Sequence, residues 1–125
     1  MKNARLALAA MFVVLGAACS DDLGDGGDAG GAFDVGVSTG TMPNYSWGAG
    51  PALGIRVSRA SATTIPVWQV ADPVNRNITS PVRHGQVPGG ATELVDDERT
   101  LTPGVRYRVE ITLADNSMAF REFTP

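Results

Sequence analysis

The chain has 125 residues, with 10 lysines and arginines, 13 aspartates and glutamates, and a net charge of −3. This length is enough for one domain of ordinary size. The acidic balance and the scattered arginines argue against a nucleic-acid-binding protein.

The first residues have the pattern of a secretory signal. Met1–Arg5 is a short basic head, and Leu6–Ala18 is an apolar run that is too short to cross a bilayer comfortably as a helix. This order predicts a bacterial signal peptide over residues 1–18. Leu15-Gly-Ala-Ala-Cys19 resembles a lipoprotein lipobox, although Gly16 stands where that box usually has a branched apolar residue. The resemblance implies cleavage before Cys19 and a diacylglycerol on its thiol.

Cys19 is the only cysteine in the chain, so no disulfide competes for it. The alternative is an ordinary signal peptide cut nearby, which leaves Cys19 as a free thiol. The several acyl chains of a mature lipoprotein hold a protein stably at a membrane. We therefore expect a membrane-anchored protein of the bacterial cell envelope. Ser20 stands where enteric lipoproteins carry an aspartate for inner-membrane retention, so the expected location is the outer membrane if the host has one.

Residues 19–32 are expected to form a tether behind the lipidated cysteine. They are rich in glycine and aspartate and hold one large apolar residue, Leu23, so they cannot bury a core. The aspartates also suggest a calcium loop, because hard cations take oxygen ligands. Their spacing fits neither an EF-hand nor a nonapeptide calcium repeat. The prediction is a disordered acidic linker that holds the domain off an anionic membrane.

Residues 33–125 alternate between apolar and polar side chains and are punctuated by glycine and proline. The strands expected before the C-terminal hairpin are Phe33–Ser38 (an edge strand), Met42–Trp47, Leu53–Arg59, Ile65–Val70 and Ala91–Val95, with an extended segment over Ser80–Pro88. Pro66 confines its strand to a sheet edge or to a strand start.

The clearest strand lies within Leu101–Leu113. From Val105 onward the odd positions are apolar or aromatic and the even positions are polar, so one face is buried and the other faces water. Asp115-Asn116 tolerates the positive φ of a tight turn. A two-residue loop there sets three cross-strand pairs, which are Leu113 with Met118, Ile111 with Phe120, and Glu110 with Arg121. Phe123 falls out of this phase, which predicts either a bulge near Glu122 or a fraying strand end.

About seven short strands, with no helical periodicity after the N-terminal segment, predict an all-β antiparallel sandwich. A domain of this size buries roughly two-thirds of the surface of its unfolded chain, which is enough for a modest core. The expected core is aromatic and aliphatic: Tyr45, Trp47, Leu53, Ile55, Val57, Trp68, Leu101, Tyr107, Val109, Ile111, Leu113 and Phe120.

Part of this pattern resembles fibronectin type III domains. Leu101-Thr-Pro-Gly104 followed by Tyr107-Arg-Val109 is similar to their Leu-x-Pro-Gly…Tyr-x-Val signature, and Tyr45-Ser-Trp47 resembles their strand B tryptophan. The resemblance covers about residues 33–125 and implies an Ig-like sandwich of about seven strands. It also implies a tyrosine corner, in which the Tyr107 hydroxyl bonds to the backbone a few residues upstream. The strand around Trp68 has no standard counterpart in that family.

His84 is the only histidine, and it is a candidate base or metal ligand. A lone histidine without other nitrogen or sulfur ligands does not build a usual zinc site, so a polar residue in a loop or at a strand end is favoured. Asp96, Asp97 and Glu98 are adjacent, which favours a solvated bend over a paired acid and base. The sequence predicts no catalytic residue, no metal and no cofactor. The alternative is a small envelope hydrolase that uses carboxylates.

Three residues are candidate ligand contacts: Trp68, Arg106 and Arg108. An aromatic on a sandwich surface stacks on sugars, and Pro66 suggests an edge for the Trp68 strand; the alternative places Trp68 in the core. Arg106 and Arg108 project from the wet face of the central strand, where guanidinium groups bind carboxylate or phosphate unless they are simply solvated. We therefore expect a non-catalytic binding or structural module with an unknown envelope protein or glycan as its partner.

Overall fold

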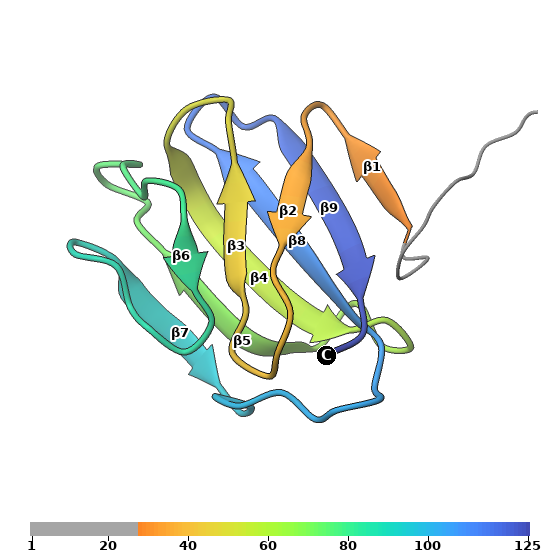
Figure 1. Ribbon diagram of the computed structural model, residues 1–125. Coiled ribbons are helices and arrows are strands. Elements are labelled where there is room, and N and C mark those ends of the chain that lie inside the picture. Colours follow the sequence, from red (N-terminus) through yellow and green to blue (C-terminus); the bar gives the residue numbers. More distant parts are fainter. Residues whose placement is uncertain (1–27) are drawn as a thin grey trace, which may run out of the picture.

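The computed structural model describes residues 28–125, which form two antiparallel sheets facing each other and contain no helix (Figure 1). The strands are β1 (Ala29–Gly31), β2 (Val35–Val37), β3 (Asn44–Trp47), β4 (Ala52–Arg59), β5 (Pro66–Ala71), β6 (Val82–Arg83), β7 (Thr92–Asp96), β8 (Tyr107–Leu113) and β9 (Met118–Phe123). One sheet has the order β1-β9-β8-β4-β5-β7 and the other β2-β3-β6. The predicted all-β antiparallel architecture is confirmed. The expected signal peptide, Cys19 and the tether up to residue 27 lie outside the described residues.

β4 and β8 form the centre of the larger sheet. The odd-numbered side chains of β8 are buried and the even-numbered ones are half-exposed, as the alternation predicts. β4 pairs with β8 so that Ile55 lies opposite Ile111 and Val57 opposite Val109. The two strands therefore bury branched side chains on the same face, where they pack well on a pleated surface.

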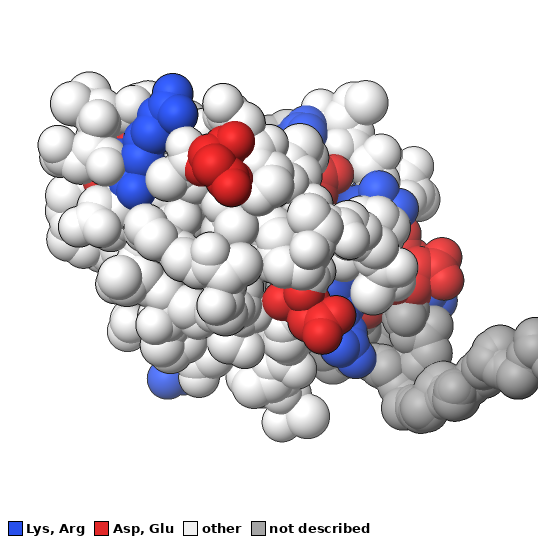
Figure 2. Space-filling view, turned by 90° about the horizontal axis from the view of Figure 1, so that it is seen from above, with Lys and Arg blue, Asp and Glu red and all other residues white. Residues whose placement is uncertain are grey.

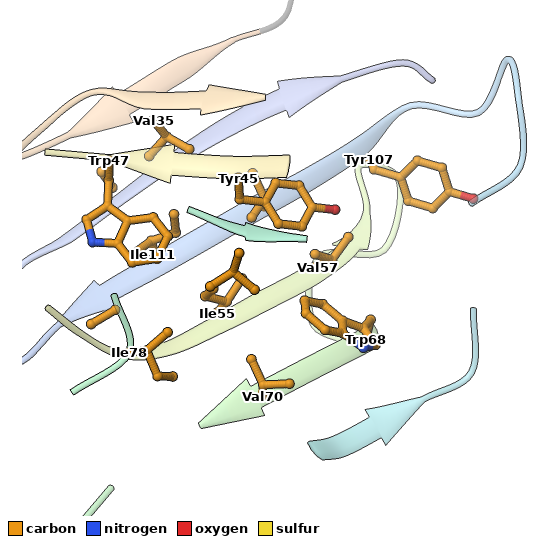
Figure 3. Packing of buried hydrophobic residues seen from close by; sticks show 14 of the residues in the cluster. Val35, Tyr45, Trp47, Ile55, Val57, Trp68, Val70, Ile78, Tyr107 and Ile111 are labelled. Carbon is orange, nitrogen blue, oxygen red and sulfur yellow. The ribbon is translucent and has the colours of Figure 1, made fainter. Parts of the chain in front are cut away.

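The core lies between the two sheets, with Tyr45 and Trp47 of the smaller sheet facing branched side chains of β4 (Figure 3). Leu53 and Phe120 are the two expected core residues that the structure does not bury. For Leu53 the reason is a register shift between Ala52 and Gly54, which turns Ala52 inward in its place. The buried apolar residues that the alternation did not reveal are Val35, Ala52, Val67, Val70, Ile78, Val82, Ala119 and Phe123.

The β8–β9 hairpin has a different register from the expected one, with Thr112 opposite Met118 and Ile111 opposite Ala119. Its loop has three residues rather than two. The Leu113 N–H donates to the Ser117 carbonyl at 2.8 Å, and the Asn116 N–H donates to the Leu113 carbonyl at 2.9 Å. Asn116 has a φ of 74°, the left-handed conformation that closes a three-residue hairpin loop.

This one-residue difference moves every β9 side chain to the other face of the sheet. Phe123 is buried opposite Tyr107, whereas Phe120 lies opposite Glu110 on the outer face. The expected pair of Glu110 with Arg121 does not form. The pairing of β8 with β9 runs without a break to Phe123, so this ladder has neither the bulge near Glu122 nor the fraying end.

β1 belongs to the segment that was expected to be a disordered tether. Its Gly30 pairs with Phe120 of β9, and a β-carbon at Gly30 would come within 2.8 Å of the Phe120 ring. Because Gly30 has no side chain, the Phe120 ring can cover β1 at this position. An aromatic ring over a glycine is a known way to stabilise that glycine in a sheet. The ordered domain thus begins before residue 33.

Two strand positions bear on the sequence predictions. β2 lies at an edge of the smaller sheet, as expected. Pro66 begins β5, but β5 is an interior strand that pairs with both β4 and β7. Proline is tolerated there because it occupies the strand start, so it gives no indication of an edge.

The observed hairpin register and the sequence pattern make opposite predictions about which phenylalanine of β9, Phe120 or Phe123, stabilises the core. Phe123→Ala should reduce the free energy of unfolding by about 3–5 kcal/mol, because it leaves a cavity in the core. Phe120→Ala should cost less than about 2 kcal/mol, because its half-exposed ring leaves no enclosed void. Urea melts of both variants check this, and a larger loss for Phe120→Ala would contradict the register.

Candidate functional site

A shallow groove of about 290 Å³ crosses the outer face of the six-stranded sheet, the face turned away from the smaller sheet. Gly54 of β4 and Ala71 of β5 lie opposite each other within it. The groove exists because these neighbouring positions lack long side chains. Its polar lining residues are Arg56, Gln69, Glu110 and Thr112, and Met118 adds an exposed apolar side chain.

Arg56 is central to this groove, because it pairs in register with Gln69 on one side and Glu110 on the other. Its guanidinium is 3.9 Å from the Glu110 carboxylate. At that distance the charges of Arg56 and Glu110 compensate each other, while N–H donors of the guanidinium and oxygen acceptors of the carboxylate stay open to a ligand. The sequence alternation identified the outward face of these strands, but only the antiparallel pairing places Arg56 beside Glu110.

Arg106 and Arg108 lie on the same face but do not line the groove. Both bind Glu122 of β9, with Nε of Arg106 at 2.9 Å and Nη2 of Arg108 at 2.9 Å from its carboxylate oxygens. The Arg108 guanidinium also lies over the Phe120 ring, 4.0 Å from its centroid. Their expected role as ligand contacts gains no support, because both guanidinium groups hold β8 and β9 together.

Opposite charges are grouped over the rest of the surface as well. Figure 2 shows acidic and basic side chains next to one another on a mostly uncharged face. The face in Figure 2 therefore carries no broad field of one sign. Elsewhere on the domain, Arg99 donates to Glu93 at 3.0 Å, to Asp96 at 2.6 Å, and to the Gly85 carbonyl.

Trp68 is a core residue, which confirms its place in the expected core and makes its alternative as a ligand contact wrong. Its side chain is 0% exposed, and its ring centroid is 4.7 Å from that of His84. The indole N–H donates to Glu93 at 2.9 Å. A sugar cannot stack on this ring, because β5 is an interior strand and Trp68 faces the smaller sheet.

His84 lies at a strand end, directly after β6, as expected, and it is fully buried. Its Nε2 lies 2.7 Å from the Glu98 carbonyl and its Nδ1 lies 2.9 Å from the Tyr45 hydroxyl. Because a carbonyl only accepts, Nε2 carries the proton and Nδ1 accepts from Tyr45. Burial raises the pKa of Tyr45, which keeps its hydroxyl a neutral donor. Both nitrogens of a neutral imidazole are thus occupied, and neither is available as a base or a metal ligand.

Glu98 is a structural residue and not part of a solvated bend. Its carboxylate accepts from the Tyr107 hydroxyl at 2.6 Å and from Arg59 at 2.8 Å. The Tyr107 hydroxyl itself accepts from the Thr102 N–H at 2.9 Å. The expected bond from Tyr107 to the backbone upstream is therefore present, and Figure 3 shows its hydroxyl pointing toward the loop before β8.

Two further findings concern only residues 28–125. These residues contain no group of three or more histidine, cysteine, aspartate or glutamate side chains that could hold a metal ion. No helix among them is long and apolar enough to cross a membrane.

Comparison with protein-family models, with curated proteins and with solved structures finds no match for this chain. A function must therefore be argued from the chemistry of the described surfaces.

His84 predicts a loss of stability in mild acid. Burial lowers its pKa in the folded state, against the opposing effect of the Glu98 carbonyl and of nearby Asp96 and Glu98. The unfolded chain therefore binds the proton more readily, so stability is present above the unfolded pKa of about 6.5 and falls as the pH drops below it. The slope should approach, and not exceed, about 1.4 kcal/mol per pH unit.

Urea melts at several pH values between 7.5 and 5 would measure this, because the chain has no other histidine. His84→Phe is the matched control. It should be less stable at neutral pH, because Tyr45 and the Glu98 carbonyl lose their partner, and its stability should stay flat across the range. A flat profile for the native protein would contradict the buried neutral imidazole.

Proposed function

We propose that this protein is a lipid-anchored lipoprotein of the bacterial cell envelope whose β-sandwich is a non-catalytic binding module. The observation that carries the binding role is the groove over Gly54 and Ala71, with its loose pair of Arg56 and Glu110. It offers several donors and acceptors on a rigid sheet, which is how sites hold a polar ligand in one orientation.

A glycan is the ligand class that this groove supports best. Its two charges compensate each other, so it suits neutral hydroxyl groups better than an ion. Gln69 and Thr112 add groups that both donate and accept, as sugar hydroxyls require. The small residues and exposed Met118 provide an apolar surface for the C–H faces of a sugar ring.

The fold part of the proposal is a fibronectin type III-like sandwich. It is supported by the strand order β9-β8-β4-β5 against β2-β3-β6, which corresponds to the two sheets of Ig-like domains. The bond between Tyr107 and the Thr102 backbone corresponds to a tyrosine corner. β1 and β7 are then additions at the two edges of the larger sheet.

The hydrolase alternative gains nothing from the geometry of His84. A carboxylate hydrolase with a histidine base requires that residue in an open site with two or more acids. His84 is buried instead, with both ring nitrogens bonded.

The anchoring part of the proposal predicts a lipidated N-terminus. Mass spectrometry of the mature protein should find an acylated Cys19, and fractionation should find it in the outer membrane where the host has one. Cys19→Ser should remain uncut, because the signal peptidase for lipoproteins acts on the modified cysteine. A free thiol at Cys19, or a Cys19→Ser protein that is still cut and still membrane-bound, would contradict the anchoring part of the proposal.

The binding part predicts that filling the groove weakens binding. Ala71→Trp places an indole in the groove without removing a polar group, and it should weaken binding to envelope polysaccharides at least about tenfold, or 1.4 kcal/mol. Val74→Trp is the matched control, because Val74 is 85% exposed and does not line the groove.

Affinity electrophoresis of the full chain against polysaccharide fractions of the cell envelope would measure both variants. Arg56→Gln and Glu110→Gln should each weaken the same interaction. Unchanged binding by Ala71→Trp would show that another surface makes the contact.

A further inference from the structure

Arg121 of β9 lies at the open side of the sandwich, where β2 of one sheet runs beside β9 of the other (Figure 1). It pairs in register with Val109 of β8 and with Ala29 of β1. Its side chain is half-buried and reaches across to the smaller sheet, where Nη1 donates to the Val35 carbonyl at 3.3 Å. A charged side chain therefore stands between the two sheets, at a position where sandwiches usually carry an apolar residue.

The positive charge of Arg121 has no acidic partner within residues 28–125. The arginines that lie within 4.0 Å of a carboxylate are Arg56, Arg59, Arg99, Arg106 and Arg108. Arg121 has only its long bond to a neutral carbonyl. A guanidinium has five N–H donors, and a charge taken partly out of water is stabilised by an opposite charge. An anion is therefore the group that residues 28–125 do not supply at this position.

Arg121 also lines two cavities, of about 510 Å³ near the start of β2 and about 440 Å³ near its end. The larger lies between β1 and β2, and its walls are largely backbone, because Gly30, Gly31 and Gly36 contribute no side chains. The exposed side chain of Asp34 lines the same cavity. Both volumes fall within the usual range of sites for small ligands, roughly 300–1,000 Å³.

We propose that the cavity between β1 and β2 binds a small polar monocarboxylate, whose carboxylate is held by the Arg121 guanidinium. The fork of a guanidinium matches the two oxygens of a carboxylate. Asp34 repels a second negative charge and disfavours a dianion such as phosphate, while it accepts hydroxyl or amino protons of the ligand. This site is separate from the groove on the outer face and stands whether or not the groove binds a glycan.

Glucuronate is a suitable probe, with glucose as the neutral control and inorganic phosphate as the dianion. Titration of the full chain, followed by its backbone amide resonances, should show saturable shifts at Gly31 and Gly36 with glucuronate and none with glucose. Arg121→Met should weaken glucuronate binding at least about tenfold. Arg83→Met is the matched control and should bind as the native protein does, because Arg83 is exposed and does not line this cavity.

Arg121→Met also removes a contact between the two sheets, so a second variant is needed that tests the cavity without this change. Asp34→Asn is that variant. It removes one exposed charge from the cavity, so it should strengthen glucuronate binding severalfold and should let phosphate bind. The absence of saturable shifts with glucuronate in the native protein would overturn the proposal. Equal shifts with glucose, or glucuronate binding that neither Arg121→Met nor Asp34→Asn changes, would also overturn it.

Discussion

The interactions of Glu98 are the constraint on which the packing of this domain depends. Its N–H donates to the Val67 carbonyl of β5, its carbonyl accepts from His84 just after β6, and its carboxylate accepts from Tyr107 of β8. Arg59, at the end of β4, neutralises its charge. One residue thereby joins three strands of the larger sheet to the smaller one. The Glu98 side chain is only 17% exposed, and an unpaired polar group there would be expensive, so the network favours one arrangement of the sheets.

An aromatic cluster surrounds this network. Tyr45 contacts Trp68, His84 and Phe123 through its ring, and Phe123 stacks with Tyr107 at a centroid distance of 6.0 Å. The polar atoms of these rings are bonded, so the cluster buries a large area without leaving donors unsatisfied. The only histidine and Trp68 are thus committed to the core. The ligand sites that we propose therefore lie on the outer face of the larger sheet and at the open side of the sandwich.

Most charges of the domain stabilise its own structure. Glu122 holds two arginines and Arg99 holds two acids, so these groups are less available to an external ion. The Arg56–Glu110 pair is looser, and Arg121 has no acidic partner in the described part of the chain. Both positions leave hydrogen-bonding capacity open next to a groove or a cavity. That open capacity is the physical basis for proposing ligands there.

The sequence by itself determined the all-β class, most strand positions and the buried face of Val105–Leu113, because these depend on local alternation and turn residues. The family resemblance also predicted the bond between the Tyr107 hydroxyl and the backbone upstream, whose partners lie a few residues apart. The tertiary structure decided the hairpin register, because the left-handed Asn116 makes a three-residue loop. The alternation of apolar and polar residues does not specify the number of residues in a loop. The tertiary structure also decided that Trp68 and His84 are core and that Arg56 meets Glu110. These outcomes depend on which distant strands pair, and a periodic pattern specifies the face of a strand but not its neighbour.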